Sequence, residues 1–203
     1  MLLSLTVIAL LFGGGVGGYI SLQKRTAVDQ ATMNIKKDIE HVKLSALLNR
    51  RDSDENWISA FAILLYMDGN QVKYRKLKFC TGSLGYSEFV KPTPFNSTSF
   101  RYSSTRCNNS NINKFVSFED KSENLVDKRV QKLYTTQGVR LILFKTITGE
   151  VQFYKKVGAN YVEVASSTMS INFCSSDNKA KRGIDLKDNS SIQFVYGSIN
   201  NCP

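Results

Sequence analysis

The sequence predicts an α+β fold, in which a long N-terminal helix, half transmembrane and half amphipathic, packs on an antiparallel β-sheet domain. One observation is an uncharged run over residues 1–23 that continues into a charged stretch without a turn signal. The other is a change of period after Trp57, where helical spacing gives way to short strand-like runs separated by turns. We therefore expect a transmembrane helix over 1–23, an amphipathic helix over 24–50 and a sheet domain over 51–203.

The first segment, MLLSLTVIALLFGGGVGGYISLQ, is long enough as a helix to span the ~30 Å apolar core of a bilayer. Two alternatives stay open. A secretory signal peptide, cleaved among the small residues at 13–18, would release the domain, but no basic segment precedes Leu2. A buried core helix is disfavoured because the apolar residues leave no polar stripe. A membrane anchor is the interpretation we favour.

The charged stretch after this segment has one apolar stripe with steps of three or four residues, as on one side of a helix. We expect the sheet to pack on this stripe, which consists of Ala31, Ile35, Ile39, Val42 and Ala46. The polar segment 49–56 predicts the end of the helix and a loop.

After Trp57 the apolar runs are those of strands. A hairpin is predicted first, from 58–67 and 71–79 joined by Asp68-Gly69, followed by a long loop over 81–114 with a short strand at 99–102. Further strands are expected at 115–118 and 132–134. The strands at 139–147, 151–155, 161–165 and 169–173 are predicted to form a meander, and two later strands are expected at 183–186 and 192–196. No helix is predicted beyond residue 50.

The chain contains four cysteines and no C-x-x-C pair. With one histidine, His41, a His/Cys metal site is not expected. Two disulfides formed in an oxidising compartment are the better interpretation. Three connectivities are possible, and we favour Cys80–Cys107 with Cys174–Cys202 because these pairs close local loops.

The residues predict no enzyme and no cofactor, since no catalytic or nucleotide-binding motif occurs. Two acidic runs, 52–55 and 119–120, lack the ligand spacing of a calcium loop, so we expect both to be solvated. The net charge of +10 favours polyanionic partners without choosing among them. Alternation along the second strand places Lys73 and Arg75 on one face and Lys76 and Lys78 on the other, which argues against one basic patch.

The layout resembles type IV pilins and type II secretion pseudopilins. The opening MLLSLTVIALLFGG is similar to the segment after the glutamate of their mature chains, with Met1 where the family has its sixth residue. The segments NWISAFAILLYMDG and STMSINFCSSDNKAKRGIDLKDNSSIQFVYG look like GspH/FimT-type minor pilins. The family's basic leader, glycine, phenylalanine and glutamate would lie upstream of Met1, so we expect the N-terminus to be truncated. Residues 81–135 carry no resemblance.

The resemblance implies a structural subunit, a minor pilin or pseudopilin of a type IV pilus or type II secretion pseudopilus. Its partners would be inner-membrane lipid and other pilin subunits, contacted through the N-terminal helix. The alternative is a membrane-anchored extracellular DNA-binding module for DNA uptake, because FimT-like pilins are implicated in uptake through a basic C-terminal segment. The matching residues here are Lys179, Lys181 and Arg182, without the family's paired-arginine motif. A solvated loop is the bland interpretation of the same residues.

The expected location is a single-pass membrane protein with the C-terminal domain in the periplasm or outside the cell. Lys24, Arg25, Lys36 and Lys37 would favour the opposite orientation by the positive-inside rule. The four cysteines outweigh that bias, because disulfides persist on the oxidising side.

Overall fold

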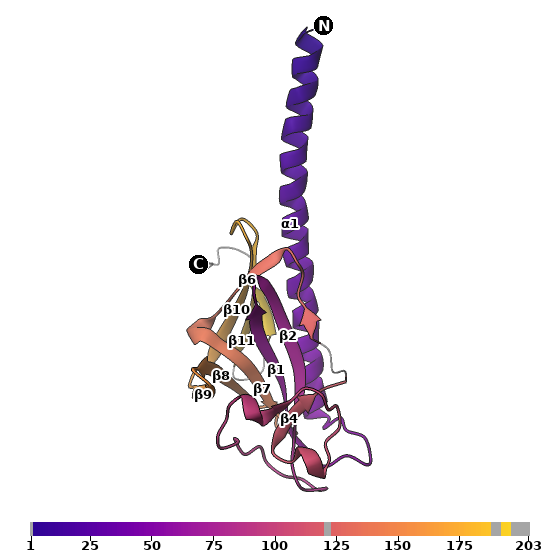
Figure 1. The fold of residues 1–203 in the computed structure, drawn as a ribbon, viewed down its shortest axis with the longest axis vertical. Coiled ribbons are helices and arrows are strands. Elements are labelled where there is room, and N and C mark those ends of the chain that lie inside the picture. The colour runs from indigo at the N-terminus through magenta and orange to yellow at the C-terminus, as the bar shows by residue number, and fades with distance from the viewer. Residues whose placement is uncertain (1, 120–122, 188–191, 196–203) are drawn as a thin grey trace.

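A computed structural model describes the backbone of residues 2–119, 123–187 and 192–195, and the side chains of 17–119 and 123–187. It confirms the α+β class: one long N-terminal helix packs against a curled, mostly antiparallel sheet (Figure 1).

The helix, α1 (Leu2–Leu47), is continuous over 46 residues, which corresponds to about 69 Å. Its N-terminal half rises beyond the sheet domain, and its C-terminal half lies along it (Figure 1). No helix within the described part of the chain is long and apolar enough to cross a membrane. Most of the predicted membrane segment, residues 1–16, lies outside the described side chains.

The apolar stripe of the helix packs on the domain as predicted. Its five residues are at most 2% exposed: Ala31, Ile35, Ile39, Val42 and Ala46. The helix ends where Asn49 adopts a left-handed conformation, with φ of 45°, and the Arg50 amide donates to the carbonyl oxygen of Ser45. A left-handed residue just after a helix satisfies its last carbonyls in this way.

The main sheet has the strand order β3-β4-β2-β1-β7-β8-β9, and β5 pairs with β2. All pairings are antiparallel except that of β3 with β4. The strands are β1 (Ile58–Asp68), β2 (Gln71–Cys80), β3 (Phe100–Arg101), β4 (Lys114–Ser117), β5 (Asn124–Leu125), β7 (Val139–Lys145), β8 (Val151–Val157) and β9 (Asn160–Val164). The predicted hairpin turn is confirmed, with Gly69 at φ of 56°.

A second sheet has the order β12-β11-β10-β6, from β6 (Val130–Thr135), β10 (Thr168–Ser175), β11 (Lys181–Lys187) and β12 (Ile192–Val195). The expected single meander is therefore wrong after β9: β10 pairs with β6 and β11 instead. Local turn signals could not reveal this long-range partner. The helical elements after α1 that the described residues contain are three-residue 3₁₀ turns, η1 (Ser97–Ser99), η2 (Asn109–Asn111) and η3 (Thr136–Gly138).

The main sheet is buried on both faces. Its near face, bearing Phe61, Ile63 and Leu65, packs with the helix stripe and the second sheet in one apolar core. Its far face, bearing Ala62 and Leu64, has a separate aromatic core that includes loop residues. We refer to the loop 81–113 as the cover loop. In Figure 1 it gathers at the end of the sheet farthest from the helix N-terminus.

Rings hold the cover loop to the far face. Phe95 lies 5.7 Å from Phe115 of β4 and 5.1 Å from Tyr154 of β8, between ring centroids. Phe100 lies 5.1 Å from Phe115. Offset and edge-on aromatic pairs of this kind stabilise a core beyond the area they bury.

Candidate functional site

The predicted basic loop, between β10 and β11, docks on the helix. Lys24 Nζ lies 2.7 Å from Asp177 Oδ2. Arg182 forms an ion pair with Asp29 of the helix, and its Nη2 donates to Asp29 Oδ2 at 3.3 Å. The hydrogen bond from Lys24, followed by those from Ser175 and the Lys179 amide, holds the pKa of Asp177 well below its usual range.

The structure separates the three predicted DNA-contact residues. Arg182 is committed to Asp29, and Lys181 is half-buried on β11. Lys179 is exposed and lines a cavity of about 190 Å³ together with Lys24 and Arg25 of the helix. The basic surface therefore consists of Lys179 and helix residues.

Sequence reasoning missed the contribution of the helix, because 153 residues separate Lys24 from Asp177. The only available signal was two adjacent cations, Lys24 and Arg25, at the end of an uncharged run. That signal indicated a membrane boundary rather than a partner for a distant loop.

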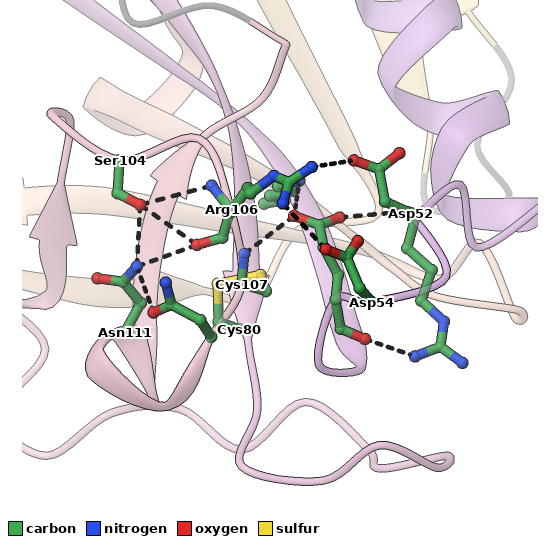
Figure 2. Close-up of polar contacts among 11 residues, drawn as sticks. Asp52, Asp54, Cys80, Ser104, Arg106, Cys107 and Asn111 are labelled. Carbon is green, nitrogen blue, oxygen red and sulfur yellow. Dashed lines mark hydrogen bonds and ion pairs between the residues drawn. A yellow bond between two sulfur atoms is a disulfide. The ribbon is translucent and has the colours of Figure 1, made fainter.

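The first predicted disulfide is confirmed. Cys80, the last residue of β2, is bonded to Cys107 across 27 positions, which closes the cover loop (Figure 2). Cys174 also belongs to a disulfide. Its predicted partner, Cys202, lies outside the described residues.

A buried ion pair lies beside this disulfide. Lys78 Nζ is 2.6 Å from Glu55 Oε1, and the side chains are 8% and 2% exposed. The same carboxylate oxygen accepts the Cys107 amide at 2.9 Å. The expectation that the acidic run 52–55 is solvated is therefore wrong for Glu55, since β2 brings a lysine to it. Asp52 and Asp54 remain exposed and pair with Arg106, at 3.7 and 2.9 Å (Figure 2).

Asn111 completes this network from the other side of the disulfide. Its Nδ2 donates to Ser104 Oγ at 2.9 Å, to the Arg106 carbonyl at 3.0 Å and to Asn108 Oδ1 at 3.0 Å (Figure 2). These bonds fix the returning part of the cover loop. The network holds the cover loop in place.

The alternation predicted for β2 is confirmed. Lys76 and Lys78 lie on the near-face side, where Lys76 pairs with Glu119 at 3.0 Å and Asp38 at 3.6 Å. Glu119 is thus a partner of the sheet rather than a purely solvated residue, and Asp120 lies outside the described residues. On the far-face side, Lys73 and Arg75 pair with Glu123.

The described side chains contain no group of three or more His, Cys, Asp or Glu residues placed to hold a metal ion. The chain matches no protein-family model, and no curated protein or solved structure is significantly similar to it. The architecture nevertheless is consistent with a pilin-like fold, and the Cys80–Cys107 disulfide indicates a location outside the cytoplasm.

Proposed function

We propose that the chain is a structural subunit, a minor pilin or pseudopilin of a type IV pilus or type II secretion pseudopilus. The subunit is held in the inner membrane by the first half of α1 and then assembles by bundling this half with the helices of other subunits. It acts by assembly rather than by turnover.

The observation that carries this proposal is the first half of α1, which extends beyond its own domain (Figure 1). Large apolar side chains are exposed there: Tyr19 and Leu22 at 62% each and Ile20 at 48%. No charge occurs before Lys24. Exposing such an apolar surface to water is unfavourable, so we expect lipid or other helices to cover it.

The proposal is tested by a charge placed on this surface. Tyr19→Asp should lower the amount of the protein in sheared surface filaments at least about tenfold, because an unpaired carboxylate in a helix bundle is costly. Val157→Asp is the matched control, since Val157 is 52% exposed on the domain. Immunoblots of sheared and cell fractions measure the distribution. Equal amounts of wild type and Tyr19→Asp in the filaments would contradict the proposal, as would absence of the wild type.

A second candidate function is DNA binding during DNA uptake, and the cluster of Lys179, Lys24 and Arg25 favours it. Two or three phosphate contacts give weak binding without sequence preference that falls steeply with salt. Lys179→Ala and Arg25→Ala, at two residues of this cluster, should each weaken binding equally for unrelated duplexes. Lys155→Ala on β8 is the control. If the wild type shows no salt-dependent binding at low ionic strength, this candidate is rejected.

A further inference from the structure

A cavity of about 430 Å³ opens on the far face of the main sheet, beside Tyr102 of the cover loop. Strands β1, β2, β7, β8 and β9 contribute to it, with Tyr102 from the cover loop. Its lining is both aromatic and cationic and includes Tyr66, Arg75, Tyr102, Arg140, Lys156 and Tyr161. Three cationic side chains and one carboxylate, that of Glu123, line it.

Arg140 enters this cavity because of a β-bulge. The register of β7 with β8 shifts between Val139 and Leu141, so Arg140 is an extra residue opposite Lys155 and Tyr154. A bulge turns a side chain out of the regular alternation, and bulges are enriched beside binding sites.

The Arg140 guanidinium is half-buried and has no partner among the described residues. Its Nη1 is inaccessible to solvent and makes no hydrogen bond. Burial lowers the pKa of Arg140, and no carboxylate among the described residues offsets this effect. An arginine stays charged at neutral pH despite such a shift, so the fold carries a partly desolvated positive charge without compensation.

The other arginine of the cavity is already engaged. Arg75 forms an ion pair with Glu123, its Nε donates to the Tyr66 hydroxyl at 3.3 Å, and its guanidinium lies 4.1 Å from the centroid of the Tyr102 ring. Hydrogen bonds from Tyr66, then Lys73 and Arg75, lower the pKa of Glu123 to about 2. Arg75 therefore shapes the cavity wall, whereas Arg140 and the exposed Lys156 make no ion pair within the described residues.

Two tyrosines supply further donors. Burial raises the pKa of the Tyr102 and Tyr161 phenols, which therefore stay protonated at neutral pH. Neither hydroxyl makes a hydrogen bond to another described residue. The cavity thus combines cationic and hydroxyl donors that have no partner among the described residues with the apolar side chain of Leu64.

We propose that this cavity binds a small organic oxyanion, a carboxylate or phosphate carried on a hydroxylated ring, such as an acidic sugar. The oxyanion meets Arg140 and Lys156, because these cations lack a partner among the described residues and a charge-assisted hydrogen bond is strongest to an ionised acceptor. The ring and its hydroxyls lie against Tyr102, Tyr161 and Leu64. This site is independent of the assembly surface on α1.

The test uses the full chain in mild detergent, titrated with glucuronate, glucose 6-phosphate and neutral glucose by calorimetry and ligand-observed NMR. At least one of the two anions should bind at least tenfold more tightly than glucose. Comparing the two anions identifies carboxylate or phosphate as the preferred group. Arg140→Gln and Lys156→Gln should each weaken binding about tenfold. Lys155→Gln, on the opposite face of the same strand, should bind as the wild type does.

Thermal unfolding without ligand separates a binding role from a structural one. Arg140→Gln should unfold at the wild-type temperature or above, because it removes an unpaired buried charge. If Arg140→Gln instead fails to fold, the exposed Lys156→Gln still decides whether binding depends on the cavity. Absence of binding by both anions, or binding unchanged in both variants, would overturn the proposal.

Discussion

The two faces of the main sheet are covered by different means. On the near face, one regular helix places Ile35, Ile39 and Val42 against the strands at helical spacing. On the far face, the irregular cover loop supplies Phe95 and Phe100 and is closed by a disulfide. Periodic apolar residues thus cover one face, while covalent closure and aromatic contacts hold a loop of little regular structure on the other.

The two faces also differ in whether their cationic side chains are paired with carboxylates. On the near face, strand β2 carries Lys76 and Lys78, and both are paired with carboxylates. On the far face, Arg75 is paired, but Arg140 is not. These near-face cations are neutralised by carboxylates, whereas the far face has an open cavity in which some hydrogen-bond donors have no partner among the described residues.

The largest expected effect is the loss of the buried Glu55–Lys78 pair. Lys78→Ala should lower the free energy of unfolding by about 3–5 kcal/mol, because it leaves Glu55 buried without a countercharge. Chemical denaturation measures the loss. The double variant Glu55→Leu with Lys78→Met should recover most of it, since no charge then stays buried. An exposed ion pair contributes at most about 1 kcal/mol. If the free energy of unfolding of Lys78→Ala differs from that of the wild type by less than this, the pair does not anchor the cover loop.

Removing the disulfide should cost somewhat less. Cys80→Ser with Cys107→Ser should lose about 3 kcal/mol, because the unfolded chain regains the freedom of a loop of 27 positions. Hydrogen exchange should rise first in the cover loop and least in β1 and the helix stripe. Uniform exchange over both faces would mean that the two coverings unfold as one unit.

The two coverings differed in how far the sequence could predict them. The helix stripe and the first hairpin were predicted because their signals are local: a period near 3.6 and an Asp-Gly turn. The pairing of β10 with β6 was missed, since strand partners distant in sequence leave no local signal. The aromatic cover was anticipated only as a loop closed by Cys80 and Cys107.

The candidate sites were less predictable than the fold. Lys179 was found from a basic run, but its neighbours Lys24 and Arg25 come from the other end of the chain. Arg140 gave no signal, because a bulge is a property of strand register rather than of composition. The burial of Glu55 depends on Lys78 reaching it from a distant strand.

A smaller effect is expected where the helix end meets the β7–β8 turn. Gly149 has φ of 66°, and an added Cβ would lie 2.6 Å from Leu47 Cδ2. Gly149→Ala should lose about 1–2 kcal/mol, from backbone strain and displacement of Leu47. Gly69→Ala should lose about 1 kcal/mol, because Gly69 has φ of 56° in open space. Thermal unfolding of both variants compares them, and a larger loss at Gly69 would contradict this packing.

The smallest effect is a change in how steeply the free energy of unfolding falls at acidic pH. The folded-state pKa of Glu123, about 2, lies below its ordinary value of 4.5. Its contribution is therefore present above about pH 4.5 and is lost as the pH falls toward 2. Glu123→Gln should make the free energy of unfolding fall less steeply with decreasing pH. The change should be slight, because this carboxylate lies at the surface and solvent screens it. If stability falls identically with pH in both proteins, the contacts of Glu123 with Tyr66, Lys73 and Arg75 are not maintained in solution.

Crosslinking between helices tests the proposed assembly most directly. Leu22→Cys places a thiol on the exposed side of the first half of α1, and Val157→Cys places one on the domain surface. In intact cells, mild oxidation should convert Leu22→Cys subunits to covalent dimers, in which the thiols of two neighbouring Leu22→Cys subunits are joined by a disulfide. The Val157→Cys protein should stay monomeric under the same conditions. Crosslinking at Val157 but not at Leu22, or at neither position in cells that form filaments, would contradict assembly through the N-terminal helix.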